Sequence, residues 1–352
     1  MKTGTGVIVV AVMMVSAVAA SVASGQNASA RQAATPRVIV PHESWTCGMP
    51  AGIPAPETGT LVFTAELPLE RLADIGRTQY GRRQVAVAQQ GTLTGAKLSG
   101  TVMTGALDFE LTLTNGVIEI EQILVLRTSD GKYVYVRSAG TGADAKDVRI
   151  VMDFEAPNAS DVAWLNTGTY VARRVVNPTS KTLTLRVYEL PAAPSPAGQD
   201  NVVRISKPAG VPPQPWDYRR AAPGEKQGPQ VITERVALSP SQSVGASKRG
   251  NRNIIPIAGG DLSGRITGKV VPGGADYQNL ASPATIDARY LWQTADGEII
   301  IVRNGGAFGS LVPTFEVRTD SPYAWLNNGL YLSSNPGMSQ GGVALTFYDS
   351  VR

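Results

Sequence analysis

The sequence predicts an all-β protein made of two tandem antiparallel β-barrels joined by a proline-rich linker. Three observations lead to this prediction. Glycine (37) and proline (24) are frequent while charged residues make up only 17% of the 352 residues, a mixture typical of short strands with many turns. Two stretches of the chain repeat each other in order. In each of them an Asp-Gly pair stands between runs rich in Val, Ile and Tyr, which predicts a β-hairpin.

Residues 1–30 have the pattern of a secretory signal peptide. Lys2 precedes an apolar run over residues 7–20, and small residues follow it. We therefore expect an exported protein, periplasmic or extracellular, with cleavage within residues 21–31 and no stable membrane insertion afterwards. The alternative is an uncleaved anchor, because the apolar stretch is nearly long enough to span a bilayer. A proline-rich N-terminal arm over residues 31–59 follows.

Sliding the chain against itself by about 160 to 170 residues aligns residues 60–190 with residues 230–352. The order of the matching segments is kept with short gaps, so the two stretches are diverged copies of one domain. Residues 191–229 between them are rich in proline and predict an extended, semi-rigid linker. The aligned segments are 61–67 with 230–236, 91–95 with 260–264, 105–109 with 273–277, 128–131 with 294–297, 136–137 with 302–303, 154–155 with 315–316, and 163–166 with 324–327.

Asp296-Gly297, taken as a two-residue turn, predicts which side chains of the second copy share a face of the sheet. One predicted face carries Asp287, Arg289, Leu291, Gln293, Ile300, Val302 and Asn304. The other carries Tyr290, Trp292, Thr294, Ile299, Ile301 and Arg303. Each copy has about eight short strands and no helical stripe, which favours closure into a barrel because closure removes exposed strand edges.

Composition argues against several function classes. The net charge of +4 comes from scattered basic pairs rather than a continuous stripe, so we expect no nucleic-acid partner. The single histidine, His42, and the single cysteine, Cys47, both precede the first copy. A histidine-based metal cluster, a Ser-His-Asp relay and an intramolecular disulfide are therefore not expected. Residues 140–142 lack the strand-to-helix setting of a phosphate-binding loop, so we predict no cofactor.

A set of motifs in the second copy carries a family resemblance. The motifs are Pro256-Ile257-Ala258-Gly259-Gly260, Leu262-Ser263-Gly264, Val271-Pro272-Gly273-Gly274-Ala275-Asp276-Tyr277, Asp287-Ala288-Arg289-Tyr290, Asp296-Gly297 and Tyr323-Ala324-Trp325-Leu326-Asn327. Together they resemble the domain of unknown function 3237 family of small calycin-like β-barrels. The resemblance implies a calycin or lipocalin-like fold and no defined activity. The first copy departs from the pattern at residues 105–108 and 121–124.

Polar residues that recur in both copies supply the candidate site. The matching pairs are Asp108 and Asp276, Glu121 and Asp287, Arg137 and Arg303, Trp164 and Trp325, and Asn166 and Asn327. The catalytic candidates are Asp276, Asp287, Tyr290 and Arg303, and the ligand-binding candidates are Arg289, Arg303, Asn304, Trp325 and Asn327. We expect Arg303, Asp287, Asn327 and Trp325 to converge at the mouth of the second barrel. Structural alternatives are an Asp287–Arg289 ion pair, a Trp325 that fills the barrel and an Asn327 that caps a strand end.

Three functions are open on this evidence. The first is binding of a small lipophilic or aromatic, largely apolar but oxygenated molecule in the second barrel. The second is a cofactor-free lyase, isomerase or cyclase in which Asp276 or Asp287 acts as base and Arg303 or Tyr290 stabilises an oxyanion. The third is a structural tandem module. We expect the first barrel to be a scaffold, because Ile123 replaces Arg289 and the loop at residues 105–108 is bulkier.

Overall fold

The computed structural model describes residues 38–45, 48–192, 201–212, 214 and 218–352. The expected signal peptide and Cys47 lie outside the described residues. Strands dominate the rest, and the helical elements are three short 3-10 turns, η1 (Pro56–Thr58), η2 (Ala163–Asn166) and η3 (Ala324–Asn327). This confirms the predicted all-β fold. In the described part of the chain, no helix is long and apolar enough to cross a membrane.

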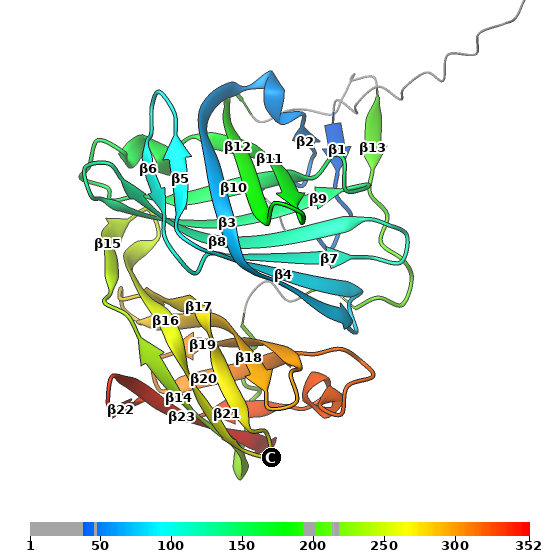
Figure 1. Cartoon of the computed structure of the whole chain (residues 1–352), viewed down its shortest axis with the longest axis vertical. Helices are drawn as coiled ribbons and strands as arrows, with labels where there is room; N and C mark the ends of the chain where they lie inside the picture. Colours follow the sequence, from blue (N-terminus) through cyan, green and yellow to red (C-terminus); the bar gives the residue numbers. More distant parts are fainter. Residues whose placement is uncertain (1–37, 46–47, 193–200, 213, 215–217) are drawn as a thin grey trace, which may run out of the picture. The chain divides into compact units, whose positions relative to one another are not determined.

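The first copy closes into an eight-stranded antiparallel barrel (Figure 1). β12 pairs with β3 from Thr182↔Pro68 to Glu189↔Thr60, which joins the two ends of the sheet. In hydrogen-bonded order the barrel strands are β3 (Thr60–Arg77), β12 (Thr182–Leu190), β11 (Thr169–Asn177), β10 (Arg149–Glu155), β9 (Tyr133–Gly142), β8 (Ile118–Thr128), β6 (Gly100–Val102) and β5 (Gly91–Thr94). β4 (Arg82–Ala88) and β7 (Leu107–Thr112) form a second ladder between β3 and β8.

The second copy is one curled sheet. Its hydrogen-bonded order is β20 (Ser310–Glu316), β19 (Ile299–Ala307), β18 (Thr285–Thr294), β17 (Gly268–Asn279), β16 (Gly250–Gly264), β14 (Lys226–Leu238), β23 (Gly342–Val351) and β21 (Tyr331–Ser333), with β15 (Gln242–Ser247) on β16 and β22 (Gly337–Ser339) on β23. The rings of Phe315 on β20 and Tyr331 on β21 lie 5.3 Å apart, so the ends of this path meet around a shared core. Trp292 and Phe347 fill that core.

The β18–β19 hairpin differs from the prediction by one residue. Thr294 exchanges backbone hydrogen bonds with Gly297 and Glu298, and Gly297 has φ +97°, so the loop is a three-residue turn whose last residue is left-handed. Arg289 therefore pairs with Arg303 and Tyr290 with Val302. Because a one-residue shift moves every side chain of one strand to the other face, the predicted faces were wrong.

Ala288, Tyr290, Trp292, Ile300 and Val302 point into the core of the second copy. Leu291 and Ile301 instead join a cluster with residues of the first copy, among them Val85 and Phe109. The strand face that carries Arg289 and Arg303 is thus the one that meets the first copy. We call the contact region between the two copies the boundary.

Described segments of the arm and the linker pack together. β1 (Val38–Val40) pairs in parallel with β13 (Val202–Arg204) and antiparallel with β2 (Ile53–Pro54). Trp45 packs with Val151 and Leu190 against the first barrel. Tyr218 lies against Gly305 of β19 at a distance that leaves no room for a Cβ there.

Candidate functional site

Arg289, Arg303 and Asp287 form a buried ion-pair network at the boundary. Nη1 of Arg289 lies 2.6 Å from one carboxylate oxygen of Glu121, on β8 of the first copy, and Nη2 of Arg303 lies 3.1 Å from the other. Asp287 accepts hydrogen bonds of 2.8 and 3.0 Å from Arg289. Burial raises the pKa of Asp287, but the guanidinium groups of Arg289, Arg137 and Arg303 outweigh it, so this pKa lies below its ordinary value.

Asn327 and Trp325 stabilise a turn. The Asn327 amide donates to the carbonyl of Val317 and accepts from its N–H, both at 2.9 Å. The Trp325 ring stacks under the guanidinium of Arg265 at 4.0 Å from the ring centroid. These two residues do not meet Arg303 or Asp287, so the expected convergence at the barrel mouth was wrong, because Arg303 and Asp287 lie on the outer face.

The interior of the second copy contains an acidic site that the sequence candidates covered only in part. Glu234 of β14 is 0% exposed, and its two carboxylate oxygens accept hydrogen bonds from the Tyr290 hydroxyl at 2.6 Å and the Trp292 indole N–H at 2.8 Å. Burial raises the pKa of Glu234 to about 7, although both hydrogen bonds favour the ionised form. Burial also raises the pKa of the partly buried Asp276 to about 6.

Glu234, Asp276, Tyr290 and Asn304 line one small cavity of about 20 Å³. The amide nitrogen of Asn304 donates to Ser333 at 3.3 Å, whereas its buried oxygen has no hydrogen-bond donor among the described residues. A cavity of this size holds about one water molecule. The interior as it stands therefore has no room for a lipophilic ligand.

A larger, apolar pocket of about 370 Å³ lies at the boundary. We call it the boundary pocket. Its walls include Val87, Ala88 and Met103 of the first copy and Pro256, Ile257, Ala258, Val271 and Pro272 of the second. Glu70, Arg71, Thr104, Ser239 and Gln242 add polar groups. Ile257, whose side chain belongs to the core of the second copy, also lines the small cavity beside Glu234, so one residue borders both spaces.

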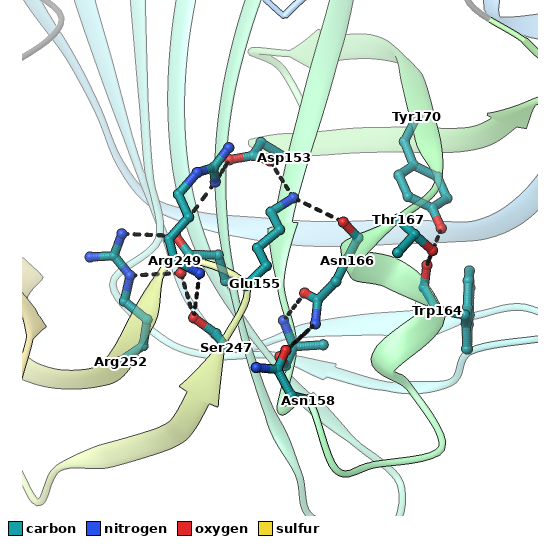
Figure 2. A network of polar contacts seen from close by, with 12 residues as sticks. Asp153, Glu155, Asn158, Trp164, Asn166, Thr167, Tyr170, Ser247, Arg249 and Arg252 are labelled. Carbon is teal, nitrogen blue, oxygen red and sulfur yellow. Dashed lines mark hydrogen bonds and ion pairs between the residues drawn. The ribbon is translucent and has the colours of Figure 1, made fainter. Parts of the chain in front are cut away.

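A second boundary cleft of about 590 Å³ is polar. Tyr135 and Tyr277 form its floor, with ring centroids 5.5 Å apart. Figure 2 shows Asp153 and Glu155 of the first copy facing Arg249 and Arg252 of the second. Lys248 also binds Asp153, so this network of ion pairs joins the two copies.

The model of a family described as a protein of unknown function (DUF3237) matches residues 57–190 and 229–310. The chain belongs to this family. The two matched segments agree with the two copies.

Curated relatives include bacterial UPF0311 proteins. UPF0311 protein blr7842 of Bradyrhizobium diazoefficiens is 39% identical over 95 residues, a match that spans 26% of this chain and 62% of that protein. UPF0311 protein CA_C3321 of Clostridium acetobutylicum is 30% identical over 125 residues, 28% of this chain and 77% of that protein. The chain thus spans less than two thirds of the length of the first of these.

Among solved structures, a β-barrel-like protein (ABAYE2633) of Acinetobacter baumannii is 20% identical with a TM-score of 0.33, over 37% of this chain and 94% of that one. The conserved protein of unknown function RPA1785 of Rhodopseudomonas palustris is 24% identical with a TM-score of 0.32, over 37% of this chain and 95% of that one.

Within this DUF3237 chain the two copies treat the shared interior aspartate differently. Asp108 of the first copy is bound by the guanidinium of Arg174, which lies 3.0 Å away through Nε, and by the amide of Gln122. The position aligned with Glu234 is Ala65. In the first interior the aspartate is therefore paired with a cation, whereas the two carboxyl groups of the second interior make no ion pair among the described residues.

The sequence candidates did not include Glu234, because they were drawn mainly from polar residues that recur in both copies. One signal was present in the sequence: Ile232, Glu234 and Val236 alternate on one strand, which places a carboxyl group on an otherwise apolar, inward face. The boundary gave no comparable signal, since the contacts that build it join residues far apart in the chain.

Proposed function

We propose that the chain binds a small, largely apolar molecule in the boundary pocket. The observation that carries this proposal is the pocket's size and lining: about 370 Å³, mostly aliphatic, with a few polar groups at its edge. Small-molecule sites in proteins fall in the same range of volume and have the same mixture of walls. Arg71 and Gln242 are placed to bind oxygen atoms of such a ligand.

Glycines of the two aligned loops make the pocket possible. The N–H of Gly274 donates to the carbonyl of Gly105 at 2.8 Å, so the loops touch through their backbones. Gly273 has φ +119°, and a Cβ on it would lie 2.6 Å from Cγ1 of Val87. A larger side chain at Gly273 would push the copies apart. The close backbone approach at Gly273 and Gly274 thus serves contact with the other copy.

A fluorescence titration tests the proposal with the probe 1-anilinonaphthalene-8-sulfonate. The wild type should bind it saturably, with its rings in the apolar pocket and its sulfonate near Arg71. Ala258→Trp, which fills the pocket, should weaken binding at least about tenfold. The matched control Ala281→Trp, at an exposed position away from the pocket, should leave it unchanged. Equal affinity in both variants would show that the probe binds elsewhere.

Export is part of the same proposal, supported by the pattern of residues 1–30. N-terminal sequencing of the protein recovered from outside the cytoplasm should give a start within residues 21–31. An intact Met1 on a membrane-bound product would contradict it.

A further inference from the structure

We propose that Glu234, with Asp276 beside it, is a general base that removes a proton from a molecule held in the boundary pocket. The inference rests on the proposed binding function and adds a reaction to it. Glu234 is not one of the polar residues that recur in both copies, and the aligned residue of the first copy is Ala65.

The geometry of the cavity beside Glu234 suits a molecule that donates hydrogen bonds. Tyr290 and Trp292 hold the Glu234 carboxylate in one orientation by one hydrogen bond to each oxygen. The buried amide oxygen of Asn304 lines the same cavity and lacks a donor among the described residues. An acceptor left in this way costs free energy unless a ligand or water supplies the donor. Two carboxyl groups and this amide thus converge on one small space.

The electrostatics also favour a base. Among the ion pairs of the described residues, none involves Glu234 or Asp276, in contrast to Asp108 with its arginine. The groups that face Glu234 are the Tyr290 hydroxyl, the Trp292 indole and Asp276. Burial and the Asp276 charge raise the pKa of Glu234 to about 7. A carboxylate with such a pKa is a stronger base than an exposed one and is still largely ionised just above neutral pH.

The sheet of the second copy is interrupted where it separates the boundary pocket from the small cavity beside Glu234. β16 and β17 pair at Pro256↔Ala275 and again at Gly260↔Val270, and the ladder is interrupted between these pairs. Ile257 lies in this interruption, pairs on its other side with Leu238 of β14, and lines both spaces. Displacement of the Ile257 side chain would therefore join them without breaking a ladder hydrogen bond. The apolar body of a substrate then stays in the pocket while its acidic end reaches Glu234.

The chemistry balances without a further reactant. A C–H or O–H bond of the substrate breaks, its electron pair stays on the substrate, and the proton forms an O–H bond with Glu234. Glu234 then returns the proton to another atom of the same molecule, which gives an isomer. A base with a pKa near 7 removes only an activated proton. The substrate class is therefore a small, largely apolar carbonyl compound with an acidic hydrogen next to the carbonyl group.

The probe 5-nitro-1,2-benzisoxazole tests for such a base, because removal of its C–H proton breaks its N–O bond and releases a coloured phenolate. With wild-type protein the rate should rise with pH to a plateau, with a midpoint near 7. Glu234→Gln should lower the plateau rate at least about tenfold. Glu66→Gln, an exposed carboxyl on the first copy, is the control and should change nothing.

Asp276→Asn provides a second readout that a merely structural role would not change. Loss of the neighbouring negative charge should lower the midpoint of the rate profile by roughly half a pH unit or more. An unchanged midpoint, or a folded Glu234→Gln protein with the wild-type rate, would overturn the inference. Binding of 1-anilinonaphthalene-8-sulfonate is measured in the same variants. Saturable binding in the pocket without base catalysis would remove the reaction and leave the binding function intact.

Discussion

The interiors of the two copies differ in whether their buried carboxyl groups are paired with a cation. At aligned positions, Asp108 of the first copy binds Arg174, while Asp276 of the second faces Glu234. Arg174 is itself buried, at 7% exposure, and Glu110 binds it as well. In the first interior the aspartate forms an ion pair with Arg174. In the second interior Glu234 and Asp276 form no ion pair among the described residues. Because unpaired buried carboxyl groups destabilise a fold, their presence in one copy only points to function there.

The largest effect is expected from breaking the pair in the first interior. Arg174→Met leaves Asp108 buried without its cation, which should lower the free energy of unfolding by about 3–5 kcal/mol. Urea denaturation at pH 7 measures this. A loss under about 1 kcal/mol would mean that Asp108 is neutralised in another way and that the interiors are more alike than described.

The second interior should instead make stability depend on pH. The folded-state pKa of Glu234, about 7, exceeds its ordinary 4.5, so its stabilising contribution is complete below pH 4.5 and is lost as pH rises through 7. From this group the free energy of unfolding should fall by about 2–3 kcal/mol between pH 5 and pH 8. Glu234→Gln should abolish that part of the decline. Parallel curves for the two proteins would contradict the raised pKa.

Arg303→Met tests how much the ion pair between Arg303 and Glu121, which crosses the boundary, contributes to stability. Its guanidinium shares Glu121 with Arg289, so Glu121 keeps a cation when Arg303 is removed. We expect a loss of about 2 kcal/mol in the free energy of unfolding, from hydrogen bonds to a charged group. Binding of the fluorescent probe should persist, since Arg303 does not line the boundary pocket. Abolished binding without any loss of stability would restore the role for Arg303 expected from the sequence.

The smallest expected effect is a gain in stability rather than a loss. Asp276→Asn removes a partly buried carboxyl group whose pKa burial raises to about 6, so above pH 6 the variant should be more stable than the wild type by about 1 kcal/mol. The matched change Asp108→Asn, which leaves Glu110 as the one carboxylate bound to the buried Arg174 among the described residues, should destabilise. Thermal unfolding of both variants at pH 8 decides between them. Equal changes of the same sign in the unfolding temperatures of both variants would show that the two copies hold their interior aspartates in the same way.

Much of the architecture could be predicted from the sequence, because duplication, turn residues and strand periodicity are local signals. The hairpin at Asp296-Gly297 was placed correctly, but a loop longer by one residue put Arg289 and Arg303 on the outer face. Asp276, Tyr290 and Asn304 do meet in one cavity. Glu234 lines the same cavity but was not predicted, because the aligned residue of the first copy is Ala65.

The boundary pocket was beyond local reasoning for another reason. Its walls combine residues such as Val87 and Pro272, which come together only when the two copies pack. The glycines at 273 and 274 signalled a close approach, and the structure shows that the approaching segment is the loop at Gly105. Pairing between domains depends on surface complementarity, and no periodicity in the chain encodes that.

The central claim is that the second interior contains a carboxyl group poised for proton transfer while the first does not. Side-chain carboxyl resonances of uniformly ¹³C-labelled protein, followed by NMR from pH 4 to pH 9, test it most directly. The account predicts that Glu234 titrates with a midpoint near 7, and that this midpoint falls in Asp276→Asn. A Glu234 resonance that titrates below pH 5, as an exposed glutamate does, would contradict it.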